Sequence, residues 1–136
     1  MTDARVGLVV VSHSKALASG VAELAGAMAR DVRIVPAGGT EDGGLGTSFD
    51  LVTAALAEAD GGAGVVVLYD IGSALLTTDT ALELIDPADA DRVEVADGPL
   101  VEGAVAAAVA AQTGKDRAAV AAAVTDAAQF WARRPG

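Results

Sequence analysis

The sequence contains no cysteine and only one histidine among its 136 residues. The lack of cysteine excludes a disulfide framework and any thiolate-bound zinc or iron–sulfur centre. One histidine with carboxylates is a poor ligand set for those metals. We therefore expect no metal site and no bound cofactor.

Aromatic residues make up only 3% of the chain, and basic residues are few: 9 lysines and arginines stand against 19 acidic residues. The formal net charge of −10 would repel phosphate backbones, which makes nucleic-acid binding a poor expectation. Apolar residues nevertheless reach 52%, which excludes a disordered chain. We expect one globular domain over residues 1–136, with a core of aliphatic and small side chains.

Long hydrophobic runs are also missing, and none approaches the roughly 18 apolar residues of a membrane span. The amino-terminal stretch Met1–Arg5 lacks the basic start of a signal peptide and leads directly into a strand-like run. We expect a soluble, cytoplasmic protein without a membrane contact.

Short apolar runs alternate with segments of helical periodicity along the whole chain. The predicted strands are Val6–Val11, Val32–Val35, Gly64–Tyr69 and Arg92–Val95. The predicted helices are Ala16–Arg30, Thr47 or Ser48 to Ala59, Ala74–Ile85, Leu100–Gln112 and Asp116–Arg133, and Asp86–Asp91 is expected to be a solvated loop. This order predicts an α/β fold of three αβα layers, with a doubly wound parallel sheet of four main strands.

Functional groups of such sheets gather beyond the carboxyl ends of the strands. Four segments satisfy that rule: Ser12–Ser14, Ala37–Thr47, Asp70–Ser73 and Ala96–Pro99. They contain the only histidine, a Gly-Gly-Thr sequence, and an aspartate directly after a buried strand. We expect the site among them.

His13 follows the first strand and lies just before the first helix, where amide N–H groups and the helix dipole favour an anion. The same dipole disfavours a protonated ring, so the neutral imidazole could act as a nucleophile towards a phosphoryl group. Asp70, one strand over, could accept a hydrogen bond from the far ring nitrogen and fix the tautomer. The alternative is that His13 only caps the helix or bonds to a neighbour.

Asp70 also admits other chemistries. Phosphoryl-accepting receiver domains carry an aspartate after the third strand, but they need an acidic pair after the first strand and a lysine after a later one, and both are missing here. A hydrolase triad of Ser12 or Ser14 with His13 and Asp70 is disfavoured, because no Gly-x-Ser-x-Gly elbow is present.

The Gly38-Gly39-Thr40 sequence could turn backbone N–H groups and a hydroxyl towards an oxyanion. It is no P-loop, since the Gly-Lys-Ser/Thr signature is missing, and a glycine-rich turn is often only a loop. The phosphate-binding candidates are Ser14, Gly39, Thr40 and Ser73. Phe130 and Trp131 are expected to be packing or dimer-contact groups.

Four segments occur in an order that resembles a known family: VGLVVVSHSKALASGVAEL (6–24), PAGGTEDGGLGTS (36–48), VVVLYDIGSALLTTDTALELI (65–85) and VADGPLVEGAVAAAV (95–109). The chain resembles the phosphotransferase subunits (DhaM) of phosphoenolpyruvate-dependent dihydroxyacetone kinases, within the mannose-type enzyme IIA domains of the sugar phosphotransferase system. The resemblance spans residues 6 to about 124.

The resemblance implies a homodimer in which His13 is phosphorylated and Asp70 orients it. It implies that the phosphocarrier protein HPr donates the phosphoryl group and that ADP on the nucleotide-binding kinase subunit accepts it. A mannose-type sugar-transport enzyme IIA that passes phosphate to a IIB domain remains an alternative, as does a non-catalytic binding module. Some members continue into further domains, so the chain is either a single-domain member or an excised piece.

Overall fold

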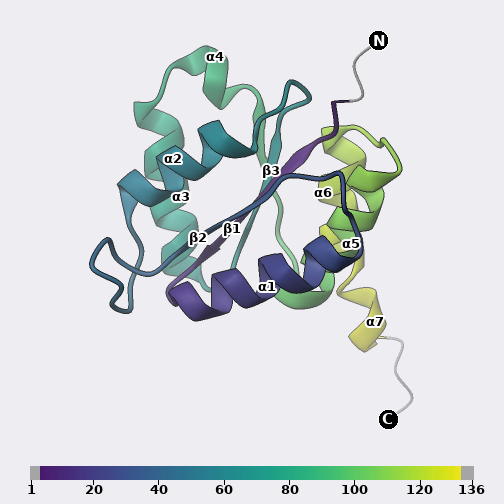
Figure 1. Ribbon diagram of the computed structural model, residues 1–136, viewed down its shortest axis with the longest axis horizontal. Helices are drawn as coiled ribbons and strands as arrows, with labels where there is room; N and C mark the ends of the chain where they lie inside the picture. Colours follow the sequence, from purple (N-terminus) through teal and green to yellow (C-terminus); the bar gives the residue numbers. More distant parts are fainter. Residues whose placement is uncertain (1–3, 133–136) are drawn as a thin grey trace.

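The computed structural model describes residues 4–132 and contains four parallel strands in one sheet, in the order β2-β1-β3-β4 (Figure 1). The strands are β1 (Gly7–Ser12), β2 (Ile34–Gly38), β3 (Val65–Tyr69) and β4 (Val93–Val95). The helices are α1 (Lys15–Ala27), α2 (Phe49–Ala59), α3 (Gly72–Leu84), α4 (Pro87–Ala90), α5 (Leu100–Gln112), α6 (Arg117–Asp126) and α7 (Gln129–Ala132). The predicted doubly wound α/β fold is confirmed.

Two helical layers enclose the sheet. Helices α1, α5 and α6 pack on one face, and α2 and α3 pack on the other, as the ribbon shows (Figure 1). The two central strands, β1 and β3, consist mostly of valine and leucine, as expected of strands covered on both faces, and every residue of β1 is buried. Alanines dominate the buried side of α5, which lets that helix lie close to the sheet.

The edge strand β2 runs further than the sequence predicts. We expected it to end at Val35, before Pro36, but it continues to Gly38. The hydrogen bonds to β1 use the carbonyl of Arg33 and the amide of Gly39. The backbone N–H and C=O groups of the odd-numbered residues of β2 therefore point towards β1. The nitrogen of Pro36, which has no hydrogen to donate, therefore faces away from the sheet, where an edge strand tolerates proline.

Three helical predictions need correction. Helix α1 ends at Ala27 rather than at Arg30, and the Asp86–Asp91 segment is not simply a loop, because Asp86 caps the one-turn helix α4. The single helix predicted over Asp116–Arg133 is divided into α6 and α7, and its last residue lies outside the described range.

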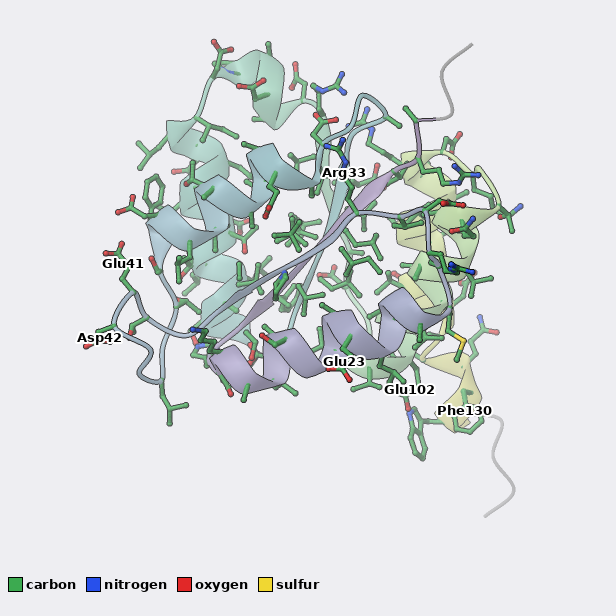
Figure 2. The ribbon with its side chains drawn as sticks, in the orientation of Figure 1. Glu23, Arg33, Glu41, Asp42, Glu102 and Phe130 are labelled. Atoms are coloured by element: carbon green, nitrogen blue, oxygen red, sulfur yellow. The ribbon has the colours of Figure 1, made fainter. Side chains whose placement is uncertain are left out.

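The short helix α7 carries the two aromatic side chains near the carboxyl end. Phe130 and Trp131 pack edge to face with ring centroids 5.1 Å apart, and the Trp131 indole donates to Glu102 on α5 at 2.9 Å. Figure 2 shows Glu102 and Phe130 at the same end of the molecule. Within residues 4–132, no helix is long and apolar enough to cross a membrane.

Candidate active site

The site lies where β1 and β3 end side by side. His13 follows β1 directly and Asp70 follows β3 directly, and these two strands are neighbours in register, with Val11 opposite Tyr69. The amide of Asp70 donates to the carbonyl of Val11 at 3.1 Å, which continues the ladder up to the site. The sheet order therefore brings together two residues that are 57 positions apart in the chain.

Asp70 holds both the backbone and the ring of His13. Its Oδ1 lies 2.9 Å from His13 Nδ1, and its Oδ2 accepts the His13 amide at 2.9 Å. A carboxylate is only an acceptor, so Nδ1 carries the ring hydrogen and Nε2 keeps its lone pair. The side chains are 24% and 13% exposed, which leaves the ring within reach of a second molecule.

Two further donors complete the shell of Asp70: the Ser12 hydroxyl at 2.9 Å from Oδ2 and the Ile71 amide at 2.7 Å from Oδ1. Burial raises the pKa of Asp70, but the hydrogen bonds from His13, Ser12 and Ile71 lower it more, so the net pKa is below its ordinary value. Asp70 is thus ionised at neutral pH, and its negative charge can balance a positive charge on the His13 ring.

The outer ring nitrogen faces the first turn of α3. Ser73 Oγ lies 2.5 Å from His13 Nε2, and with the lone pair on Nε2 the hydroxyl is the donor. Helix α3 has no side-chain cap, since its N-cap residue is Ile71. Among the described residues, no acceptor is paired with the amides of Gly72 and Ser73. Unpaired amides at a helix start favour an anion.

The start of α1, where we predicted the anion site, carries a side-chain cap. Its N-cap Ser14 uses its hydroxyl to accept the Leu17 amide at 3.1 Å. The Ser14 amide in turn donates to Ser12 Oγ at 3.0 Å. The described contacts of Ser14 are therefore made within its own turn, and its role in phosphate binding stays a prediction.

The glycine-rich loop is closed on itself and anchored beside the site. The Gly39 amide donates to the Ser12 carbonyl at 3.1 Å, and the Thr40 amide donates to the Gly44 carbonyl at 2.9 Å. The Thr40 hydroxyl bonds to Asp42. A phosphoryl oxygen would have to compete with these partners, so phosphate contact by Gly39 and Thr40 also stays a prediction.

Two features of Gly39 explain why glycine is needed there. Its φ of +77° lies in the left-handed region, and a Cβ at this position would lie 2.9 Å from the Gly44 carbonyl oxygen. The Gly46 amide donates to the His13 carbonyl at 2.8 Å, which ties the far end of the loop to the site. The glycine-rich loop thus fixes the main chain at His13 through its own hydrogen bonds.

Charge is distributed unevenly along the strands. Within residues 4–132, Lys15 is the one cationic residue in the segments at the His13 edge, whereas the others lie where strands begin: Arg5, Arg30, Arg33, Arg92, Lys115 and Arg117. Figure 2 shows Arg33 at the far end of β2 from Glu41 and Asp42, which point outward from the loop. A phosphoryl group on His13 would meet little positive charge from this chain.

Exposed leucine and isoleucine side chains belong to the segments that meet at His13. They are Leu17 (42% exposed), Leu45 (84%), Ile71 (59%) and Leu76 (67%). A cavity of about 280 Å³ near the site opens instead at the β2 edge, and its lining includes Lys15, Glu41 and Glu58 but not His13. Exposed apolar side chains on the segments around His13 suit contact with a protein partner.

In the described part of the chain, no group of three or more histidine or acidic side chains is placed to hold a metal ion. Sequence patterns had singled out Ser12 only as a disfavoured nucleophile. Its full burial and its bond to Asp70 were not foreseen. The one available signal was its position as the last residue of a buried strand beside His13.

Comparison with known proteins gives a consistent family. The model of the PTS system fructose IIA component family (EIIA-man) matches residues 7–121. The chain is 42% identical over 113 residues to the phosphoryl donor subunit DhaM of a PEP-dependent dihydroxyacetone kinase from Providencia stuartii, which covers 80% of this chain and 24% of the relative. It is 40% identical over 105 residues to the DhaM of kinase 2 from Listeria innocua, covering 76% and 84%. The chain thus spans about a quarter of one relative and most of the other.

Solved structures agree on the fold. A crystal structure of a protein of unknown function, EF1359, superposes with a TM-score of 0.81 at 30% identity and covers 90% of this chain and 94% of that one. The dihydroxyacetone kinase of C. freundii in its native form reaches a TM-score of 0.59 at 17% identity, over 92% of this chain and 24% of that one. At that identity the likeness concerns the fold alone.

Proposed function

Because the chain belongs to the PTS fructose IIA component family (EIIA-man), we propose that it relays a phosphoryl group through a phosphohistidine at Nε2 of His13. The observation that carries the proposal is the pair of contacts on the ring. Asp70 accepts from Nδ1, and Ser73 donates to Nε2. This arrangement leaves the exposed nitrogen as the nucleophile and keeps a counter-charge behind it.

The first transfer proceeds from a phosphohistidine of the phosphocarrier protein HPr. The Nε2 lone pair of His13 attacks phosphorus, a new N–P bond forms, and the N–P bond to HPr breaks and returns its electron pair to the donor ring. Nδ1 keeps its hydrogen throughout, so the ring becomes cationic and Asp70 balances the charge. Ser73 must leave Nε2 for this step, and its hydroxyl can then donate to a phosphoryl oxygen beside the Gly72 and Ser73 amides.

The second transfer reverses the first with a different acceptor. A terminal phosphate oxygen of ADP, held on the nucleotide-binding subunit of a dihydroxyacetone kinase, attacks the phosphorus. The N–P bond breaks and the lone pair returns to His13. The names of the relatives support this acceptor, since they are phosphoryl donor subunits of such kinases. The chain would thus act as a phosphotransferase that does not itself bind the triose.

The rim of exposed apolar side chains around His13 supports docking of both partners at this edge, with water excluded during transfer. We further propose that the chain acts as a single domain in a homodimer and works in the cytoplasm, where these partners would meet it. Ser14, Gly39 and Thr40 remain candidate phosphate contacts in addition to Ser73.

The deciding experiment measures intact mass after incubation with phosphoenolpyruvate, enzyme I and HPr. The wild type should gain one phosphate that is lost in acid and survives base, as expected of phosphohistidine. His13→Ala should gain none. Ser73→Ala removes the nearest alternative nucleophile and should still be labelled, because the phosphate is on His13. A base-labile label that persists in His13→Ala would overturn the proposal and point to Asp70 as the acceptor, whereas no label on the wild type would leave a binding module as the better account.

A second candidate shares the first step and differs in the acceptor. The family description names a fructose IIA component, which favours a sugar-transport enzyme IIA that passes its phosphate to a IIB domain. The purified phosphoprotein distinguishes the two. Loss of label to the ADP-loaded kinase subunit with formation of ATP supports the kinase role, and loss only to a IIB domain supports sugar transport.

A further inference from the structure

Two polar side chains among the described residues are fully buried, Ser12 and Thr78. The Thr78 hydroxyl donates to the Ala74 carbonyl one turn earlier in its own helix, at 2.9 Å. The Ser12 hydroxyl instead joins two segments of the site, because it donates to Asp70 Oδ2 at 2.9 Å and accepts the Ser14 amide at 3.0 Å. The Thr78 hydroxyl is thus bonded within its own helix, whereas the Ser12 hydroxyl contacts the carboxylate that holds His13.

We propose that Ser12 is a positioning residue for phosphoryl transfer: its hydroxyl fixes Oδ2 of Asp70, so that Oδ1 holds the Nδ1 hydrogen of His13 and the lone pair stays on Nε2. The inference rests on the proposed function for its effect on transfer. Its effect on the ring is independent of that function, because the contacts are present in the unphosphorylated protein.

The geometry explains why this hydroxyl is needed. A carboxylate can turn about its own bond, and the orientation of Oδ1 depends on what holds Oδ2. Here Oδ2 has two donors, the His13 amide and the Ser12 hydroxyl. Without Ser12 a single donor, the His13 amide, remains on Oδ2, and the carboxylate is freer to turn. Oδ1 then holds the Nδ1 hydrogen less well, and the ring moves towards the Nε2-protonated tautomer that a free histidine side chain prefers in water.

The second bond of Ser12 connects the site to α1. Its oxygen accepts the amide of Ser14, the residue whose own hydroxyl caps that helix. Removal of the oxygen would leave this amide without its acceptor, which costs stability in addition to the effect on the ring. A test of positioning must therefore separate the two effects.

Thr78→Val provides the matched control for Ser12→Ala, since it also deletes a buried hydroxyl but one that is bonded only within α3. For each protein, nitrogen NMR measures the tautomer of His13 at neutral pH without any partner. The rate of phosphoryl acceptance is then measured against HPr concentration. We expect Ser12→Ala to increase the Nε2-protonated fraction and to lower kcat about tenfold with little change in KM, because one charge-assisted hydrogen bond corresponds to about a decade in rate. Thr78→Val should change neither.

Ser12→Cys extends the series with a group of similar size and a weak donor, and it is expected to fall between Ser12 and Ser12→Ala in both measurements. The proposal is overturned if Ser12→Ala matches Thr78→Val in tautomer and rate, or if a folded Ser12→Cys keeps the wild-type tautomer when Ser12→Ala fails to fold. A shifted tautomer in Ser12→Ala together with no labelling of the wild type would retain the positioning role and reject the phosphoryl relay.

Discussion

Replacement of Asp70 by asparagine is the sharpest test of how the site works, because it keeps the shape of the side chain and removes its charge. Asp70 accepts from four donors: the amides of His13 and Ile71, the His13 ring and the Ser12 hydroxyl. An asparagine can accept at one oxygen only, and its NH₂ group must face two of those donors. The Ser12 hydroxyl can turn and accept, but a backbone amide cannot.

Either orientation of the new amide damages the site. If its oxygen faces Ile71 and the ring, its NH₂ group meets the His13 amide, which is then left without an acceptor. If its NH₂ group faces the ring, Nδ1 must become the acceptor and the hydrogen moves to Nε2, which removes the nucleophilic lone pair. Weakening two hydrogen bonds to a charged group, at about 2 kcal/mol each, corresponds to about a thousandfold loss in the rate of phosphoryl acceptance.

The assay is the time course of intact mass with catalytic enzyme I and HPr, and Asp97→Asn is the matched control. Asp97 lies two residues after the end of β4, at the same edge of the sheet, and it accepts from the Tyr69 hydroxyl rather than from His13. Its replacement should leave the rate within about threefold of wild type, well under one decade. A similar rate for Asp70→Asn would refute the assignment of Asp70 as the group that sets the tautomer.

Two further predictions concern stability. Asp60 accepts two bonds from the Arg92 guanidinium, at 2.7 and 2.9 Å, and this partner holds its pKa well below the ordinary 3.8. The ionised Asp60 therefore stabilises the fold fully above pH 3.8, and this stabilisation declines as pH falls below that value. The loss of Tm caused by Asp60→Asn at pH 7 should therefore become smaller in acid. A loss that grows in acid would contradict this pH dependence. Gly38→Ala should lower Tm by several degrees, because its Cβ would lie 2.5 Å from the Ser14 carbonyl oxygen. A Cβ at Gly26 would meet no atom within 4 Å, so Gly26→Ala should raise the free energy of unfolding by about 0.5–1 kcal/mol. Equal effects of the two substitutions in thermal unfolding would refute the packing argument.

The strand pattern was sufficient to predict the sheet and the pairing of His13 with Asp70. Short runs of valine and leucine marked β1 and β3, and the geometry of parallel strands then required their carboxyl ends to meet. The prediction needed no knowledge of side-chain conformation, because the main chain of both residues continues directly from a strand.

The fine structure of the loops was beyond such reasoning. Sequence favoured the start of α1 as the anion site, but it did not show that Ser14 caps that helix or that the N-cap of α3, Ile71, gives no side-chain cap. Sequence also suggested the Thr40 hydroxyl as a donor to phosphate, and it did not show that this hydroxyl bonds to Asp42. These partners depend on the conformation of the loop, including the positive φ of Gly39, Gly43 and Gly46, which composition alone does not specify.

The separation of cationic residues from the His13 edge also bears on how the molecule meets other proteins. Lys15 stands alone at that edge, whereas the remaining described lysines and arginines lie near the beginnings of the strands. Carboxylates lie at both ends of the strands, and Glu41, Asp42, Asp50 and Asp97 lie at the His13 edge, so this edge carries an excess of negative charge. The field of a basic surface on an approaching protein would turn that edge forward before the two proteins touch. Orientation would thus be selected during diffusion, and encounters would slow as added salt shortens the reach of the field.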